Sequence, residues 1–300
     1  MRFPFTGVIP VDKPAGATSR QVVDAVARAL GLRAVGHAGT LDPLAEGVVV
    51  VCVGHATKLV DFLHQQPKQY EAGFLLGRSS PSDDLETPVE EEPAPRQPSR
   101  AEVEAALAGF RGEILQRPCD YSAVHVGGQR AYRLARKGRD VEIAAKPVRI
   151  DRLELADYDW PRLGLSVECS TGTFIRAIGR DLAVALGTRA VMERLVRTAV
   201  GPFVRRASLP LADVTPTTAA AALLPALAAV PHLPQVTLAP ALLAAAIRGT
   251  LIEPPVAALA ASPAPATAIA ACDDADDLVG ILQPHPSGGW RLKPNFRGAG

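Results

Sequence analysis

Six consecutive apolar residues, at positions 48–53, constrain the fold of this chain more than any other feature. Five of the six are valines, whose branched side chains pack well on a pleated sheet and disfavour helix. An apolar run without polar alternation is typical of a strand that is buried on both faces. We therefore expect a sheet that has this strand in its interior.

The segments around this run alternate irregularly between strand and helix patterns, without a fixed repeat period. Thr18 or Ser19 marks one helix start, and Ser99 marks another, followed three residues later by Glu102 as in a capping box. The predicted strands cover 7–11, 71–76, 148–155 and 164–169, and the predicted helices cover 20–30, 100–110 and 173–186. This order indicates a mixed α/β (α+β) fold. We expect a larger domain over residues 1–232 and a smaller, β-rich domain over residues 233–300.

Two long stretches lack a clear strand or helix pattern. Residues 79–100 are polar, acidic and proline-rich, which predicts a surface loop. Residues 215–247 contain no Asp, Glu, Lys or Arg and exceed the roughly 20 apolar residues that span a bilayer. Five prolines divide this second stretch, and proline interrupts helices. We therefore predict an Ala/Pro-rich linker flanked by short helices, and no membrane span.

The cysteines and the N-terminal segment indicate the compartment. The four cysteines are far apart and form no C-x-x-C pair, which disfavours a zinc site and a disulfide framework. The first residues are interrupted by prolines before an apolar segment forms, unlike a secretory signal. We expect a cytoplasmic protein.

The net charge of +1, from 32 basic and 31 acidic side chains, conceals an uneven distribution. Residues 111–210 hold 18 basic and 11 acidic side chains, residues 1–110 hold 10 and 14, and residues 211–300 hold 4 and 6. The basic residues form two series, Arg130, Arg133, Arg136, Lys137 and Arg139, and Arg176, Arg180, Arg189, Arg194, Arg197, Arg205 and Arg206. The central third therefore suits an acidic partner, although the net charge alone suggests none.

The loop at residues 36–47, directly before the apolar run, carries the strongest candidate for chemistry. Its glycines allow positive φ and close approach, and Pro43 biases Asp42 toward extended backbone. A carboxylate held on such a turn can act as a nucleophile or a general base. From spacing alone, a simple Asp-Pro turn is the more common arrangement. His37 has no metal-ligand spacing to Asp42 and, by itself, suits a structural role.

This loop is one of several motifs that follow one another along residues 7–203. They are GVIPVDKPAGATS, GHAGTLDPLAEGV followed by VGHATKL, KQYEAGFLLG, PCDYSAVHVGGQRAYRLARKGRDVEI and CSTGTFIRAIGRDLAVALG. In this order they resemble the TruB-type transfer-RNA pseudouridine synthases, and the C-terminal tail is similar, more weakly, to a PUA-type RNA-binding domain. The resemblance implies a catalytic domain with a large, mainly antiparallel sheet over residues 1–232 and a PUA-like domain over residues 233–300.

The resemblance also implies an activity. Such enzymes convert the uridine in the T-arm loop of transfer RNA to pseudouridine: they break the base–sugar bond, rotate the uracil and rejoin it through carbon 5. They use no metal, nucleotide or organic cofactor, and the chain has no metal-binding or phosphate-loop motif. The target uridine must be extruded from a folded RNA loop, which costs a few kcal/mol.

Individual residues take roles from the same resemblance. Asp42 falls on the family's essential aspartate, and whether it attacks the sugar, attacks the uracil ring or assists elimination stays open. Arg176 falls on the arginine that pairs with this aspartate, where a permanent cation would keep it ionised. Tyr70 falls on the tyrosine that stacks on the base. The remaining positions matched at or near the substrate are Leu195, Lys13 and His37.

The chain departs from the family pattern at two places. The family usually has tyrosine two residues before the arginine, and this chain has Phe174. Phenylalanine keeps the ring packing against uracil but cannot transfer a proton, so another group or a water makes that transfer, or the hydroxyl is not required. Residues 78–87 differ from the family pattern as well, and Asp84 takes the acidic position there without an assigned role.

Three other functions are compatible with parts of the sequence. A non-catalytic RNA-folding chaperone with the same pocket is supported only by Phe174. A guide-RNA-dependent synthase is disfavoured because the first motif begins within ten residues of the start and long basic tails are missing. Without the resemblance, a hydrolase with Asp42 as nucleophile would be the fallback. We expect a monomer that binds transfer RNA, without a guide RNA or a membrane.

Overall fold

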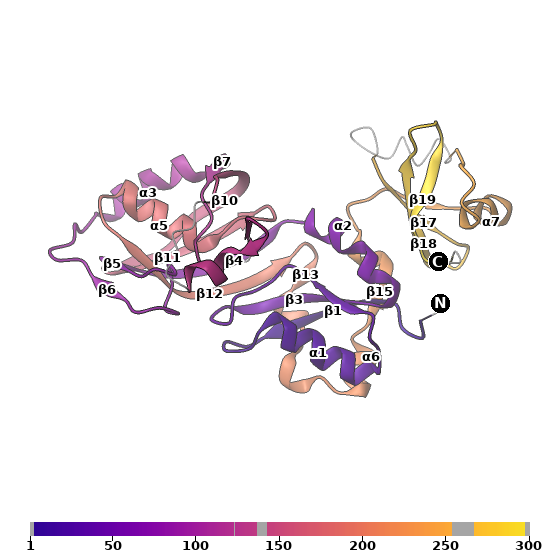
Figure 1. Ribbon diagram of the computed structural model, residues 1–300, viewed down its shortest axis with the longest axis horizontal. Coiled ribbons are helices and arrows are strands. Elements are labelled where there is room, and N and C mark those ends of the chain that lie inside the picture. Colours follow the sequence, from indigo (N-terminus) through magenta and orange to yellow (C-terminus); the bar gives the residue numbers. More distant parts are fainter. Residues whose placement is uncertain (1–2, 123, 137–142, 254–266, 298–300) are drawn as a thin grey trace.

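The computed structural model describes residues 3–122, 124–136, 143–253 and 267–297 (Figure 1). The longer strands and their partners are β1 (Gly7–Lys13), β2 (Val35–Ala38), β3 (Glu46–Val53), β4 (Lys68–Leu76), β7 (Gly112–Gln116), β10 (Lys146–Asp159), β11 (Arg162–Cys169), β12 (Ala190–Val200), β13 (Phe203–Val204), β14 (Leu209–Pro210) and β15 (Leu224–Pro225). The helices are α1 (Ser19–Leu30), α2 (Val60–His64), α3 (Arg100–Leu107), α4 (Ala131–Ala135), α5 (Ile175–Ala185), α6 (Pro216–Ala221) and α7 (Pro240–Ile247). Two short hairpins pair β5 (Arg78–Ser79) with β6 (Glu90–Glu91), and β8 (His125–Val126) with β9 (Gln129–Arg130).

One large sheet forms the centre of the molecule. Its strands follow the order β14-β1-β3-β12-β4-β11-β10-β7, and β2, β13 and β15 pair beside this path. The pairs β1–β14 and β3–β12 are parallel, and the other pairs are antiparallel. The predicted mixed α/β fold around a mainly antiparallel sheet is therefore confirmed.

Strand β3 contains the apolar run and is buried on both faces, as predicted. Val49, Val51 and Val53 belong to the core cluster that the helices cover, whereas Val48 and Val50 belong to a cluster on the opposite face. Successive side chains of a strand point to opposite faces. Both faces are covered, so the run needs no polar alternation.

Helices α1 and α3 begin where their caps predict. The Thr18 side chain accepts a hydrogen bond from the Gln21 amide in front of α1, and Ser99 caps α3 in the same way. Helix α1 contacts β3 and α6, while α3 contacts β10 and α5 contacts β12. Figure 1 shows α1 and α6 beside β1 and β3, and α3 and α5 at the other half of the sheet. The apolar sides of α1, α3 and α5 share one core cluster with the sheet.

Strand β12 was not predicted from the sequence, where Arg194 and Arg197 were considered only as members of the second basic series. It lies between β3 and β4 in the sheet. Glu193, Arg194 and Arg197 interrupt its apolar residues, and this disguises the pattern of a buried strand. The structure buries Arg197 all the same, with 2% of its surface exposed.

The region that was predicted to be a surface loop contains a buried turn. Residues 79–100 include the short strand β6, and most of their side chains are exposed or half-buried. Ser82 and Asp84 are exceptions, with exposed fractions of 0% and 2%. The Met192 amide on β12 donates to the Asp83 carbonyl at 2.9 Å. This bond ties the turn to the central sheet and corrects the prediction for these residues.

The C-terminal residues form a second, four-stranded sheet. It contains β16 (Gln235–Thr237), β17 (Ile269–Cys272), β18 (Leu278–Pro284) and β19 (Trp290–Asn295), in that order. This sheet lies apart from the large one in Figure 1, and its side chains share a cluster with β1 and β3. Among the described residues, no helix is long and apolar enough to cross a membrane. The boundary after residue 232 remains a prediction; it lies between β15 and β16.

Candidate active site

A cavity of about 240 Å³ lies beside the central strands β4 and β12. Its walls come from the loop at 39–42, from β4 and β12, and from the turn that leads into α5. Five of the seven predicted site residues line it: Asp42, Tyr70, Phe174, Arg176 and Leu195. Residues that are distant in sequence therefore share one small volume.

The loop that carries Asp42 is tied to the start of α1 on both sides of the aspartate. The Ser19 hydroxyl accepts from the Leu41 amide at 2.8 Å and donates to the Leu41 carbonyl at 3.1 Å. The Gly16 amide donates to the Pro43 carbonyl at 2.7 Å. Ser19 is 3% exposed, so these bonds are shielded from water. The backbone that carries the Asp42 carboxylate is thus held from both neighbours.

Lys13 and His37, the other two predicted residues, lie outside the cavity lining. Lys13 is fully buried, and its ammonium donates to the carbonyls of Ala17 at 2.7 Å, Pro14 at 3.0 Å and Pro43 at 3.5 Å. Burial lowers the pKa of Lys13 to about 8, although the charge of Asp42 opposes this shift. Lys13 therefore stabilises the loop that carries Asp42 through the backbone carbonyl of Pro43. His37 lies on β2, where burial lowers its pKa.

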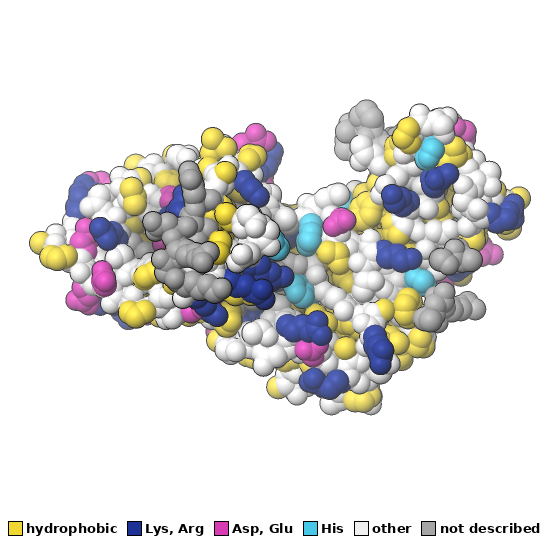
Figure 2. All heavy atoms as spheres, in the orientation of Figure 1, with side chains coloured by type: hydrophobic (Ala, Val, Ile, Leu, Met, Phe, Trp, Pro, Cys, Tyr) yellow, Lys and Arg dark blue, Asp and Glu magenta, His cyan; other side chains and the backbone are white. Residues whose placement is uncertain are grey.

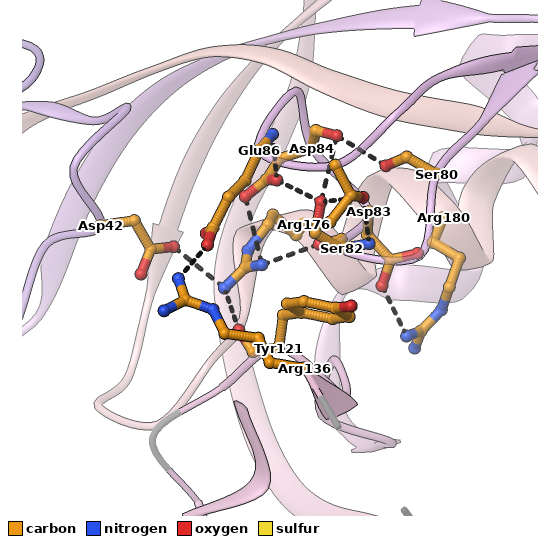
Figure 3. A network of polar contacts seen from close by, with 11 residues as sticks. Asp42, Ser80, Ser82, Asp83, Asp84, Glu86, Tyr121, Arg136, Arg176 and Arg180 are labelled. Carbon is orange, nitrogen blue, oxygen red and sulfur yellow. Dashed lines mark hydrogen bonds and ion pairs between the residues drawn. The ribbon is translucent and has the colours of Figure 1, made fainter. Parts of the chain in front are cut away.

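Arg176, in the first turn of α5, bridges two carboxylates (Figure 3). Its Nη2 lies 3.1 Å from Oδ2 of Asp42, and its Nη1 lies 3.2 Å from Oδ2 of Asp84. The same nitrogens donate to the carbonyls of Ser82 at 2.7 Å and Tyr121 at 2.9 Å. The Arg176 side chain is 5% exposed. Such a fixed guanidinium can orient Asp42, because its N–H groups point in set directions.

Asp84 is a site residue to which the sequence analysis assigned no role. Its Oδ1 accepts from the Ser82 hydroxyl at 2.6 Å and from the Glu86 amide at 2.9 Å. The side chain is 3% exposed, and a buried carboxylate needs such partners. The match to an acidic family position was the only signal in the sequence that pointed to it.

The pKa of Asp42 is shifted by opposing influences. Burial raises the pKa above its usual range, the charge of Arg176 lowers it, and the charge of Asp84 raises it again. The Asp42 side chain remains 40% exposed, so a substrate can reach the carboxylate. The group is thus an accessible carboxylate that gains a proton at higher pH than an ordinary aspartate.

Two aromatic residues, Phe174 and Tyr70, line the cavity. The Gln116 side chain, 2% exposed, accepts from the Phe174 amide at 2.8 Å and donates to its carbonyl at 3.1 Å. Gln116 therefore fixes the backbone of Phe174, a contact that the sequence did not reveal. Tyr70 lies on β4 opposite Arg197 of β12, and Leu195 is two residues from Arg197. Burial raises the pKa of Tyr70, and the Arg197 guanidinium opposes this shift.

The described members of the first basic series are all exposed cations. Arg130, Arg133 and Arg136 are exposed on β9 and α4, and Lys137 and Arg139 lie outside the described residues. The guanidiniums of Arg133 and Arg136 lie 5.9 Å and 5.6 Å from the centre of the Tyr132 ring. Figure 2 shows Lys and Arg side chains gathered near the middle of this face of the molecule.

Only part of the second basic series is available to an acidic partner. Arg176 and Arg197 are buried, and a buried guanidinium cannot reach an RNA backbone. Arg205 is bound to Asp12 and Glu46. The exposed members are Arg189, Arg194 and Arg206. Part of the positive charge of the central third is therefore structural.

Comparison with protein families and known proteins identifies relatives of this chain. The family model for TruB family pseudouridylate synthases (N-terminal domain) matches residues 27–175. The chain is 46% identical to a tRNA pseudouridine synthase B of Gloeobacter violaceus over 212 residues. This matched region covers 69% of this chain and 72% of that protein. It is 44% identical over 202 residues to a tRNA pseudouridine synthase B of Mycobacteroides abscessus, covering 66% and 68%.

Solved structures with the same fold extend over nearly the whole chain. A Cbf5–Nop10–Gar1 complex contains a chain that is 24% identical, with a TM-score of 0.72, covering 97% of this chain and 85% of that chain. A chain of an H/ACA RNP bound to a substrate RNA containing 2′-deoxyuridine is 22% identical, with a TM-score of 0.71, covering 97% and 84%. At these identities the likeness concerns the fold alone.

Proposed function

The chain belongs to the TruB family of pseudouridine synthases, and from this premise we propose that it isomerises uridine 55 in the T-arm loop of transfer RNA. The observation that carries the proposal is the Asp42–Arg176 pair at 3.1 Å in the wall of a cavity. A carboxylate that is both oriented by a cation and accessible suits attack on, or elimination from, a bound nucleoside.

The target base enters the cavity by leaving the RNA stack. Its extrusion costs a few kcal/mol, and stacking on Tyr70 recovers part of this, roughly 1–3 kcal/mol. Leu195, 6% exposed on β12, provides an apolar wall. The base–sugar bond then breaks with the help of Asp42, the uracil rotates, and carbon 5 bonds to the sugar.

The surroundings of the cavity suit a folded RNA loop. The exposed cations Arg130 and Arg133 can contact phosphates, which positions RNA without reading its bases, whereas Arg136 is paired with Glu86. Stacking and cavity shape then select an unstacked loop nucleotide. We propose that the enzyme acts as a monomer and without a guide RNA.

Tritium at carbon 5 of uridine tests this function, because carbon 5 must lose its hydrogen when it bonds to the sugar. We expect the protein alone to release tritium from unmodified transfer RNA and from an isolated T-arm hairpin, with the new pseudouridine mapped to position 55. Release only in the presence of an added guide RNA would contradict the proposal, as would modification at another position.

Phe174→Tyr tests the alternative function of a non-catalytic RNA-folding chaperone, which Phe174 favours. We expect the single-turnover rate to stay within about tenfold of wild type, or 1.4 kcal/mol of barrier, because the clamped backbone keeps the ring in place. Tight transfer-RNA binding by the wild type without any product, and a gain of activity in the variant, would favour the chaperone.

The pH dependence of the rate tests the state of Asp42. Burial raises its pKa, so we expect activity to be lost as pH falls through a value above the usual range of an aspartate. Asp84→Asn removes a nearby negative charge that raises this pKa further and should therefore move the acid limb to lower pH. Single-turnover pH profiles of both proteins measure the shift. A limb that moves to higher pH would contradict this electrostatic account.

A further inference from the structure

Lys68 of β4 and Arg197 of β12 place two buried positive charges in the cavity wall. Their exposed fractions are 4% and 2%. Arg197 is the cross-strand partner of Tyr70, and Lys68 precedes Tyr70 by two residues, which puts both side chains on one face of β4. We call this pair the cationic floor. It lies beside Tyr70, on which we propose that the target base stacks.

The cationic floor differs from Arg176 in its partners. Lys68 donates to the carbonyls of His64 at 2.7 Å and Gln66 at 2.6 Å and to the Thr171 hydroxyl. These neutral oxygens satisfy N–H groups but do not cancel the charge. Among the described residues, no carboxylate forms an ion pair with Lys68.

Arg197 is likewise bound by neutral groups. Its guanidinium donates to the carbonyls of Val48 at 2.7 Å, Gly39 at 3.0 Å and Thr40 at 3.4 Å. Gly47 lets β3 and β12 come this close: it has a φ of +104°, and a Cβ there would lie 2.1 Å from the Arg197 carbonyl oxygen. In the described part of the chain, Arg197 has no ion pair either.

Two like charges in one buried wall are unfavourable without an anion. Burial and the charge of Arg197 lower the pKa of Lys68 to about 8. Among the described residues that line the cavity, the one carboxylate is that of Asp42, which pairs with Arg176. Uncompensated buried charge destabilises a fold, whereas fixed charges near a reacting group stabilise charge that develops there. The two cations in this wall therefore suit an anionic group inside the cavity.

We infer that the cationic floor stabilises the negative charge that uracil carries after its bond to ribose breaks, an inference that rests on the proposed function. The electron pair of the C1′–N1 bond leaves with the base and spreads over N1 and the two carbonyl oxygens. Asp42 meanwhile bonds to C1′ or takes the C2′ proton. The uracil loses its negative charge when C5 bonds to C1′. In the same step Asp42 is released from C1′ or, in the other case, the proton returns to C2′. C5 then loses its proton and N1 gains one.

An RNA phosphate is the other anion that the substrate brings. Lys68 and Arg197 are almost completely buried in the wall, whereas the phosphates belong to the strand outside the extruded base. The depth of the cationic floor therefore favours the uracil.

Leaving-group substitution tests the inference. Fluorine at carbon 5 stabilises the uracil anion by itself. The reaction of 5-fluorouridine RNA should therefore depend less on the cationic floor than the reaction of uridine RNA does. We expect Lys68→Met and Arg197→Met to lower the single-turnover rate of uridine consumption by roughly 10²–10³-fold, with RNA affinity unchanged. With 5-fluorouridine RNA, the same variants should lose at least about tenfold less.

Variants that keep the charge separate electrostatics from structure. Lys68→Arg and Arg197→Lys should retain most of the rate, and Arg162→Met, an exposed change on β11, is the matched control. Thermal unfolding checks folding; if a Met variant unfolds, Lys68→Gln, whose amide still donates to carbonyls, replaces it.

The other results of these experiments distinguish the roles of Lys68 and Arg197. Equal losses on both RNAs, or losses as large in Arg197→Lys as in Arg197→Met, would overturn the inference and leave the proposed function standing. Weaker RNA binding with a smaller salt dependence would assign the cations to a phosphate. A wild type that converts no uridine would overturn the proposed function and this inference with it.

Discussion

Asp42→Asn is expected to lower tritium release from carbon 5 by more than about 10⁴-fold, equivalent to about 5.5 kcal/mol of barrier. Asparagine has nearly the same shape and can still accept a hydrogen bond from Arg176. It cannot form a bond to the sugar as a carboxylate does, and it cannot take up a proton at neutral pH. Single-turnover assays with tritiated transfer RNA measure the effect.

The fold should survive this change. Ser19 holds the loop through the Leu41 backbone and Gly16 through the Pro43 backbone, so we expect the free energy of unfolding to change by less than about 1 kcal/mol. Asp24→Asn, which makes the same substitution in an exposed ion pair on α1, is the matched control and should leave the rate unchanged. Release by the Asp42 variant at the rate of this control would refute the proposed mechanism.

Arg176→Met is expected to affect both catalysis and stability. The side chain is 5% exposed and lies between Asp42 and Asp84, and removal of one partner from a buried ion pair costs about 3–5 kcal/mol. The rate should fall roughly 10²–10³-fold, because Asp42 loses its fixed orienting charge. Urea denaturation and single-turnover kinetics measure the two effects separately.

The double variant Arg176→Met, Asp84→Asn separates the causes. It removes the buried carboxylate that the single variant leaves without its cation, so it should regain part of the lost stability. The rate should stay low, because the orientation of Asp42 still lacks Arg176. Recovery of the rate together with stability would mean that Arg176 serves only the fold.

Patterns that depend on neighbouring residues were predicted well. The apolar run in β3 and the caps Thr18 and Ser99 follow from local rules of burial and hydrogen bonding. Strand β12 was missed because its charged residues break the apolar pattern. Its place is decided by pairing with β3 and β4, more than 100 residues away in sequence.

The sequence by itself determined the fold class, the family and the loop that presents Asp42, because these depend on residue order and on short spacings. Only the tertiary structure decided which charges meet. Arg176 reaches Asp84, 92 positions earlier, and Arg197 reaches the Gly39 carbonyl, 158 positions earlier. Burial separates a structural arginine from a solvated one, and burial is a property of the packed chain. For this reason the same residue type binds a carboxylate at position 176, lines the cavity without one at 197, and faces solvent at 130.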